Sequence, residues 1–260
     1  MTPAKRLLRW VALPLLPVLS VCAATPDDGA WRRFDVEAGG RVLAAAAPQA
    51  LRGEVLTVFI EGDGAAHDAR GQPTRDPTPR DPISLKIAKA WPGTNKVWLG
   101  RLCQYTRERD AACAPGDWSL NRFSGGAVAA ANAALDRLKA QSGARRLALV
   151  GWSGGGTVAA LAAAKRSDVE TLVTIAAPLD LAAWTATMRI SPLPAEGDPA
   201  RAGALPMKQV HLYGGRDRTV PPASQLGAAR AMGGTTAVWA GERHACCWDR
   251  RAAEIAGLIR

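Results

Sequence analysis

The residues best suited to chemistry lie in the stretch Gly151-Trp152-Ser153-Gly154-Gly155, where an apolar run gives way to glycines around one serine. The preceding residues 147–150 have the composition of a buried strand, and the alanine-rich residues 157–164 favour a helix. The Gly-x-Ser-x-Gly spacing is typical of a nucleophile elbow, a sharp strand-to-helix turn that exposes the serine hydroxyl. A plain glycine-rich turn is the alternative. A phosphate loop would need lysine after its glycines, and Thr157 follows instead.

The candidate base is one of three histidines. A serine hydroxyl becomes a good nucleophile only when a base accepts its proton, and an acid must orient that base. After a nucleophile elbow the expected chain order is serine, acid, histidine. His67 precedes the serine, and His211 lies inside a predicted strand. His244 follows the last predicted strand in a loop, so it is the preferred base, with a solvated loop histidine as the alternative.

Two aspartates can supply the acid, because Asp180 and Asp217 both follow a predicted strand and both lie between the serine and the histidine. Asp217 is preferred, since the turn 214–221 can present a carboxylate at the edge of the sheet. As an alternative, Asp217 is only a turn residue paired with Arg216 or Arg218, and Asp180 only caps the next helix.

An oxyanion would need two N–H donors near the serine. The backbone amide of Gly154 is the first candidate, and the second should come from Gly62 and Asp63, in the loop after the strand at 54–60. Asp63 would donate its backbone N–H, because its carboxylate would repel the developing charge. The alternative is an ordinary acidic turn over residues 61–64.

Strand and helix patterns alternate along the chain, which predicts an α/β fold with a mostly parallel central sheet covered by helices on both faces. Asp81 and Pro82 are expected to start one helix and Ser124 to cap another. Residues 179–206 form a small cap excursion between the strands near 176 and 209. Ligands bind such sheets beyond the carboxyl ends of the strands, where each candidate residue falls. Predicted strands cover 31–36, 41–46, 54–60, 96–100, 147–150, 171–176, 209–213 and 235–239, and later helices cover 223–232 and 248–259.

Composition supports one domain over residues 25–260, since a chain of 260 residues that is 48% hydrophobic can bury a full core. The formal net charge is +10. Removal of an N-terminal segment holding Lys5, Arg6 and Arg9 would lower it to +7. The other arginines are scattered and not interleaved with aromatic residues, which indicates a basic solvated surface and no nucleic-acid partner. Binding to anionic envelope surfaces stays open.

Residues 1–24 have the layout of a secretory signal peptide, with a basic start, an apolar stretch and small residues. Cleavage would follow Ala23 or Ala24. Leu19-Ser20-Val21-Cys22 also resembles a bacterial lipoprotein box, which makes Cys22 a candidate lipidation site. The chain is therefore expected to be exported, either into the periplasm or anchored to a membrane and facing the periplasm.

Four further cysteines, at positions 103, 113, 246 and 247, are compatible with disulfides in an exported protein. Three pairings exist for four cysteines. A bond between Cys103 and Cys113 closes a short loop and leaves Cys246 and Cys247 to each other. Two free thiols or a cross-pairing are the alternatives. Metal binding is less favoured, because no second spaced pair of ligands is present.

With these residues in view, the chain resembles the α/β-hydrolase superfamily, and within it bacterial secreted or lipoprotein-type serine hydrolases. The resemblance spans residues 55–260. Its motifs are Ile60-Glu61-Gly62-Asp63-Gly64, Asp76-Pro77-Thr78-Pro79, Cys103-Gln104-Tyr105 with Cys113, Trp118 with Arg122-Phe123-Ser124, the serine motif, Ala177-Pro178-Leu179-Asp180 with Trp184, Asp217-Arg218-Thr219-Val220-Pro221, and His244.

The resemblance implies a catalytic triad of Ser153, Asp217 and His244, with no metal and no organic cofactor. Glu61 departs from it, since many members have histidine before the oxyanion glycine. The expected function is an exported serine hydrolase that cleaves small carboxylic esters through an acyl-enzyme. A serine peptidase or amidase is the near alternative, and a catalytically silent envelope-binding protein is the alternative from another class. Neither the natural substrate nor the oligomeric state follows from these motifs.

Overall fold

The computed structural model describes residues 31–48 and 51–259. The predicted signal peptide, with Cys22, lies outside the described residues. Among the residues that are described, no helix combines the length and the apolar character needed to cross a membrane.

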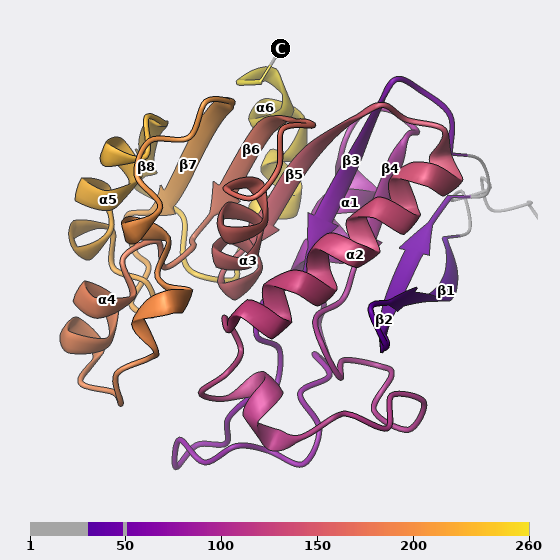
Figure 1. The fold of residues 1–260 in the computed structure, drawn as a ribbon. Helices are drawn as coiled ribbons and strands as arrows, with labels where there is room; N and C mark the ends of the chain where they lie inside the picture. The colour runs from indigo at the N-terminus through magenta and orange to yellow at the C-terminus, as the bar shows by residue number, and fades with distance from the viewer. Residues whose placement is uncertain (1–30, 49–50, 260) are drawn as a thin grey trace, which may run out of the picture. The chain divides into compact units, whose positions relative to one another are not determined.

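An eight-stranded sheet forms the centre of the fold, in the strand order β1-β2-β4-β3-β5-β6-β7-β8 (Figure 1). The hairpin of β1 and β2 is antiparallel, and β2 also pairs with β4 in antiparallel fashion. From β4 to β8 every pairing is parallel. The loops that follow β3, β5, β7 and β8 therefore leave the sheet at the same edge. The strands are β1 (Arg32–Ala38), β2 (Arg41–Ala47), β3 (Val55–Ile60), β4 (Lys96–Leu99), β5 (Arg146–Trp152), β6 (Val169–Ile175), β7 (Lys208–Gly214) and β8 (Thr235–Trp239).

Helices cover both faces of this sheet, as its apolar strands require. Figure 1 shows α2 and α3 in front of the sheet and α1 and α6 behind it. Two separate groups of buried side chains fill these layers: Leu135 and Val158 belong to the first, Ile87 and Ile255 to the second. The helices are α1 (Ile83–Ala90), α2 (Gly125–Ser142), α3 (Gly154–Ala163), α4 (Leu181–Met188), α5 (Leu226–Ala231) and α6 (Ala252–Gly257), with short 3-10 turns η1 (Pro115–Trp118), η2 (Ala195–Gly197), η3 (Pro199–Arg201), η4 (Pro222–Ser224) and η5 (Trp248–Arg251).

The structure confirms the predicted α/β fold class, including the cap excursion, which contains α4. Ser124 caps α2 as predicted, its hydroxyl accepting from the amide of Ala127. The two predicted helices at 223–232 and 248–259 are shorter than expected, because each begins with a 3-10 turn, η4 and η5.

The predicted start of α1 is wrong. Pro82 occupies the N-cap position and makes no side-chain cap. Asp81 instead forms an exposed ion pair with Lys86 at 2.5 Å. The N-terminal amides of α1 are satisfied from elsewhere: those of Ser84 and Leu85 donate to the carboxylate of Glu61, at 3.3 and 3.4 Å. The buried carboxylate of Glu61 therefore accepts the N-terminal amides of α1, the role that was expected of the adjacent Asp81.

Candidate active site

Ser153 lies at a sharp turn between β5 and α3, as the Gly-x-Ser-x-Gly motif predicted. Its backbone has φ 52° and ψ −131°, a conformation that side chains with a Cβ rarely adopt. The turn also brings α3 against the end of β3: a Cβ on Gly155 would overlap the carbonyl oxygens of Ile60 and Glu61. Glycine at 155 is therefore a packing requirement of the turn.

Three side chains from separate loops form one hydrogen-bonded chain. Ser153 Oγ lies 3.0 Å from His244 Nε2, and His244 Nδ1 lies 2.8 Å from Asp217 Oδ2. The other carboxylate oxygen of Asp217 accepts the backbone N–H groups of Thr219 and Val220, each at 2.8 Å. The Asp217 side chain is fully buried, and that of His244 is 17% exposed. The imidazole is thus in contact with the serine hydroxyl on one side and oriented by a carboxylate on the other.

The other candidates for base and acid lie elsewhere. Asp180 caps α4, its carboxylate accepting from the amide of Ala183 at 2.8 Å. His67 is exposed in a loop. His211 is buried in β7 with its Nδ1 2.8 Å from Thr174 Oγ1, and burial lowers its pKa to about 4. Asp217 is therefore the aspartate that meets the His244 ring.

Two tryptophans fix the backbone of the His244 loop, a role that no pattern in the sequence predicted. The indole N–H groups of Trp152 and Trp248 both donate to the carbonyl oxygen of His244, each at 2.9 Å. The ring centroids of Trp152 and His244 are 5.1 Å apart. The base is therefore held from its backbone as well as from its ring. Trp152 stands within the serine motif, but nothing local marks its partner 92 residues away.

The predicted oxyanion donors are not equally suited to the role. Gly154 is the first residue of α3, where an amide has no acceptor within the helix. The amide of Gly62, by contrast, donates to Glu61 Oε1 at 3.0 Å, so the prediction for Gly62 does not fit this geometry. Its carbonyl oxygen is also engaged, accepting from Gln104 Nε2 at 2.8 Å. Asp63 remains the candidate second donor, since its amide makes no hydrogen bond to the described residues.

Glu61 anchors the loop that carries Asp63. Its side chain is fully buried and accepts from Trp98 Nε1 at 2.8 Å, in addition to Gly62 and the first turn of α1. Burial raises the pKa of Glu61, and these hydrogen bonds oppose that shift. The residue that departs from the family pattern therefore ties the end of β3 to β4 and α1.

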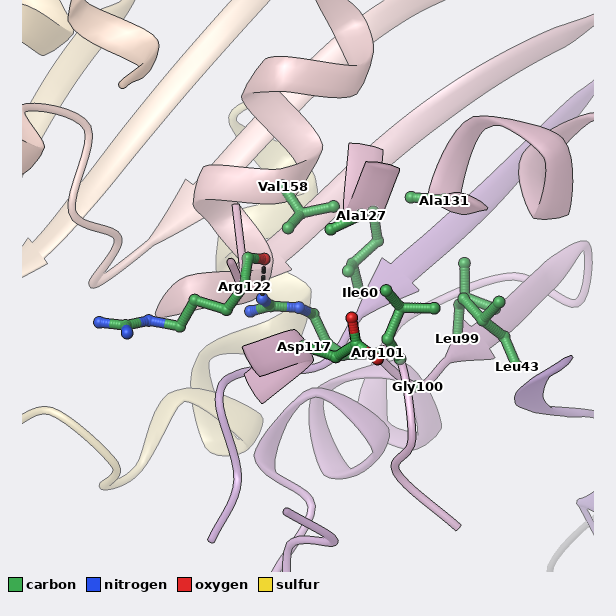
Figure 2. A pocket seen from close by; sticks show the side chains of 11 residues that line it. Leu43, Ile60, Leu99, Gly100, Arg101, Asp117, Arg122, Ala127, Ala131 and Val158 are labelled. Carbon is green, nitrogen blue, oxygen red and sulfur yellow. Dashed lines mark hydrogen bonds between the residues drawn. The ribbon is translucent and has the colours of Figure 1, made fainter. Parts of the chain in front are cut away.

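Two arginines hold the carboxylate of Asp63, and neither was predicted as a site residue. Arg101 Nη1 lies 2.7 Å from Asp63 Oδ1, and Arg122 Nε lies 3.2 Å from Asp63 Oδ2. Figure 2 shows both arginines at a small internal cavity, where Arg101 Nη2 donates to the carbonyl oxygen of Arg122 at 2.5 Å. Burial would raise the pKa of Asp63, but the charges of Arg122 and Arg101 prevail and hold it below its usual value. Asp63 therefore stays ionised while its backbone remains available for other contacts.

An open cavity of about 830 Å³ lies beside the His244 ring. Trp184 from α4 donates its indole N–H to the carbonyl oxygen of Thr219 at 2.7 Å, so the cap excursion packs on one wall of this cavity. The lining residues are Gly215, Arg216, Asp217, Arg218, Thr219, Arg243, His244, Ala245 and Cys246.

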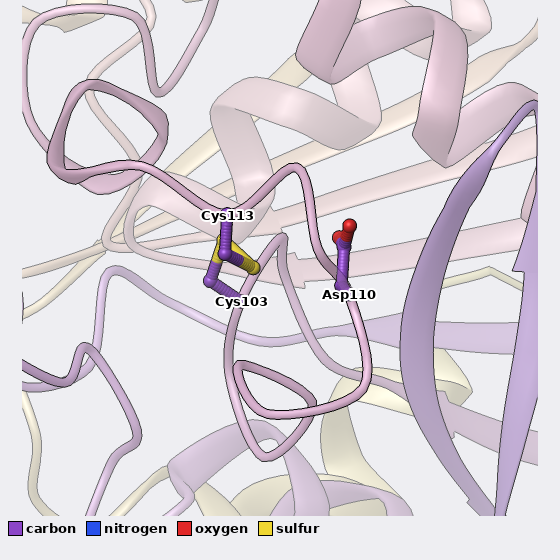
Figure 3. Close-up of side chains that lie close together, drawn as sticks. All are labelled: Cys103, Asp110 and Cys113. Carbon is purple, nitrogen blue, oxygen red and sulfur yellow. A yellow bond between two sulfur atoms is a disulfide. The ribbon is translucent and has the colours of Figure 1, made fainter.

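The structure joins Cys103 to Cys113 and Cys246 to Cys247, the pairing considered first from the sequence. Figure 3 shows Asp110 close to the first of these disulfides. The two sulfurs are bonded to each other and offer no thiolate to a metal ion. Asp110 forms an ion pair with Arg41 at 2.9 Å. This group therefore links the loop after β4 to the hairpin.

The chain was compared with protein families, with curated proteins and with solved structures. No family model matches the chain, and no curated protein matches it. Solved structures do match. One, described as an α/β serine hydrolase homologue from Coxiella burnetii, has a TM-score of 0.60 at 16% identity and covers 88% of this chain and 95% of its own.

Two further solved structures match the chain to a similar extent. A Xanthomonas campestris protein, described as an α/β serine hydrolase without a lid, has a TM-score of 0.56 at 15% identity and covers 95% of this chain and 94% of its own. The esterase domain of a Rhodothermus marinus protein has a TM-score of 0.58 at 14% identity, covering 88% and 96%. Identities this low establish the fold alone. The chain therefore has the α/β-hydrolase fold.

Proposed function

We propose that this chain is a serine hydrolase that cleaves carboxylic esters through an acyl-enzyme on Ser153. The observation that carries the proposal is the hydrogen-bonded chain from Ser153 through His244 to Asp217. A general base must lie within hydrogen-bond reach of the proton it removes, and 3.0 Å between Ser153 Oγ and His244 Nε2 meets that condition. The fold of the solved neighbours supports the same reading.

In the proposed reaction, Ser153 Oγ attacks the acyl carbon while its proton passes to His244 Nε2. Asp217 holds the Nδ1 proton and stabilises the imidazolium that forms. The bond between the acyl carbon and the alcohol oxygen then breaks, and His244 returns the proton to the leaving alcohol. Water, activated by the same imidazole, attacks the acyl-enzyme, releases the carboxylic acid and restores the Ser153 hydroxyl.

The backbone amides of Gly154 and Asp63 are the proposed oxyanion donors. Two preorganised donors stabilise the tetrahedral intermediate more than the ground-state carbonyl, and loss of one such donor typically lowers kcat by about 10² to 10³. Arg101 and Arg122 support this arrangement, because they neutralise the Asp63 carboxylate that would otherwise repel the developing oxyanion.

We also propose that the protein is exported, on the basis of residues 1–24 and the disulfides. Disulfide bonds persist in oxidising compartments such as the bacterial periplasm. Cys22 is the proposed attachment point for a lipid anchor if the segment is processed as a lipoprotein signal. Mass spectrometry of protein isolated from membranes would distinguish a lipidated Cys22 from a cleaved N-terminus at residue 24 or 25.

Hydrolysis of p-nitrophenyl esters with acyl chains of two to twelve carbons tests the proposed chemistry. We expect turnover by the native protein and none above background by Ser153→Ala. Ser167→Ala, which removes an exposed hydroxyl remote from the turn, is the matched control and should retain full activity. A parallel panel of amides and thioesters separates an esterase from a peptidase. Folded protein that hydrolyses none of these compounds would favour the envelope-binding alternative.

A further inference from the structure

Three arginines line the cavity beside His244. Arg216 and Arg218 flank Asp217 in the loop after β7, and Arg243 precedes His244 in the loop after β8. All three are exposed, and none of their side chains forms a hydrogen bond or ion pair with another described residue. The cavity beside His244 therefore carries three positive charges with no ion-pair partner among the described residues.

The cavity contains no carboxylate that could neutralise them. Asp217 is the only acidic residue among those that line it, and its carboxylate is buried against His244 and the turn amides. Exposed arginines elsewhere are paired in several cases: Arg109 with Asp35 at 2.5 Å, and Arg145 with Glu54 at 2.7 Å. Other exposed arginines, such as Arg146, also lack an ion pair with a described residue. The distinguishing feature of Arg216, Arg218 and Arg243 is that they line one cavity, which holds no free carboxylate.

The backbone holds two of these arginines in place. The amide of Arg216 donates to the carbonyl oxygen of Glu242 at 2.9 Å, which ties the two loops together. The amide of Arg243 donates to the carbonyl oxygen of Cys246 at 3.0 Å. Arg216 and Arg243 therefore start from backbone positions that hydrogen bonds fix in the loops after β7 and β8, while their long side chains remain free to adapt to a ligand.

We propose that this cavity binds an anionic group of the substrate, a carboxylate or a phosphate carried on the acyl or alcohol part of the ester. A guanidinium matches both groups through paired hydrogen bonds, and clefts lined by one sign of charge concentrate ligands of the opposite sign. The inference rests on the proposed function for the reaction itself, but the binding of the anion stands on the arginines alone. A merely solvated basic surface would bind no anion through these individual side chains.

A pair of substrates that differ in one charge tests the proposal: the 4-nitrophenyl half-ester of glutaric acid and 4-nitrophenyl valerate. The measured quantity is the ratio of their kcat/KM values. We expect Arg218→Gln and Arg243→Gln each to lower this ratio about tenfold, mainly through the KM of the half-ester, because each removes a charge-assisted hydrogen bond. Arg243→Lys should restore part of the ratio. Raising the salt concentration should lower the ratio in the native protein.

Arg146→Gln is the matched control. It makes the same change of charge at an exposed arginine that begins β5, at the opposite end of the strand from Ser153. The native ratio should persist in this variant. Inhibition of valerate hydrolysis by inorganic phosphate, lost in Arg218→Gln and Arg243→Gln, would identify phosphate as the better ligand. A ratio unchanged in both variants, without phosphate inhibition, would overturn the inference and leave the proposed function intact.

Anion binding can be measured even if no ester is hydrolysed. Calorimetric titration of the native protein with inorganic phosphate and with glutarate measures anion binding without turnover. Binding by the native protein and by Arg146→Gln, but not by the triple variant Arg216→Gln/Arg218→Gln/Arg243→Gln, would support the anion site while the proposed function failed. Equal binding, or none, in all three proteins would refute the site.

Discussion

The exchange Asp217→Asn tests the proposed hydrogen-bonded chain most sharply, because the structure dictates how the new amide must turn. Asp217 Oδ1 accepts the amides of Thr219 and Val220, each at 2.8 Å. Only the amide oxygen of asparagine can accept from them, so the NH₂ group must face His244 Nδ1. His244 Nδ1 must then accept a hydrogen bond from this NH₂ group, so the ring proton moves to His244 Nε2. An imidazole protonated at Nε2 cannot take the proton of Ser153.

The magnitude follows from that change of tautomer. In a serine protease the same exchange leaves the geometry intact and lowers kcat by about 10⁴, which corresponds to about 5 kcal/mol of transition-state stabilisation. We expect a loss of that order here. The turn amides keep their acceptor, so thermal unfolding of the variant should remain close to that of the native protein.

The assay is kcat/KM for a p-nitrophenyl ester, measured for the native protein, Asp217→Asn and Asp180→Asn. The last variant is the control, because Asp180 is the other candidate acid and the structure uses it only to cap α4. Asparagine is an equally good N-cap, so Asp180→Asn should keep its activity. A loss of less than tenfold in Asp217→Asn, or a large loss confined to Asp180→Asn, would refute the assignment of the acid.

Three further predictions concern the buried His211, the anchor Glu61 and the disulfide between Cys103 and Cys113. Burial lowers the pKa of His211 from 6.5 to about 4, so the unfolded chain binds a proton at a higher pH than the folded protein does. The free energy of unfolding should therefore fall by about 3 kcal/mol as the pH drops from 6.5 to 4. The variant His211→Gln should lack this fall. Glu61→Gln removes the carboxylate that accepts hydrogen bonds from the Trp98 indole and the α1 amides, which should lower the free energy of unfolding in urea by about 2 kcal/mol. Because the loop that carries Asp63 is then less well held, kcat should fall by a larger factor than KM rises. Peptide mapping without reduction should recover Cys103 and Cys113 in one linked peptide.

Separate outcomes would contradict these three. If the free energy of unfolding falls equally with pH in the native protein and in His211→Gln, the buried histidine is not the cause of that fall. A Glu61→Gln variant with native stability and native kcat would show that the carboxylate does not anchor the loop. Recovery of Cys103 and Cys113 as free thiols would remove the disulfide.

Local patterns made the fold and part of the site predictable. The Gly-x-Ser-x-Gly spacing fixes a turn through the close approach of Gly155 to β3, and such a constraint shows in the sequence itself. Asp217 and His244 were chosen because each lies in the loop after a strand of a parallel sheet, where the strand ends meet. The alternation of apolar strand and helix patterns along the chain likewise predicted a central sheet covered by helices.

Contacts between distant segments were not predictable. Glu61 caps a helix 23 residues further on, and the adjacent Asp81, the natural local choice, lies exposed beside Lys86. The arginines around Asp63 come from positions 38 and 59 residues away. The engaged amide of Gly62 depends on the rotamer of its neighbour, Glu61. Charges and rotamers of this kind are set by packing, and no local spacing in the chain reports them.

Labelling with a fluorophosphonate probe tests the central claim most directly, because the probe reacts with a serine only when a neighbouring base activates it. The measurement is the mass of the modified peptide after digestion. The account predicts one adduct, on Ser153, in the native protein, and none in Ser153→Ala or in native protein unfolded before labelling. Equal labelling of the native protein and Ser153→Ala, or an adduct on another serine, would contradict it.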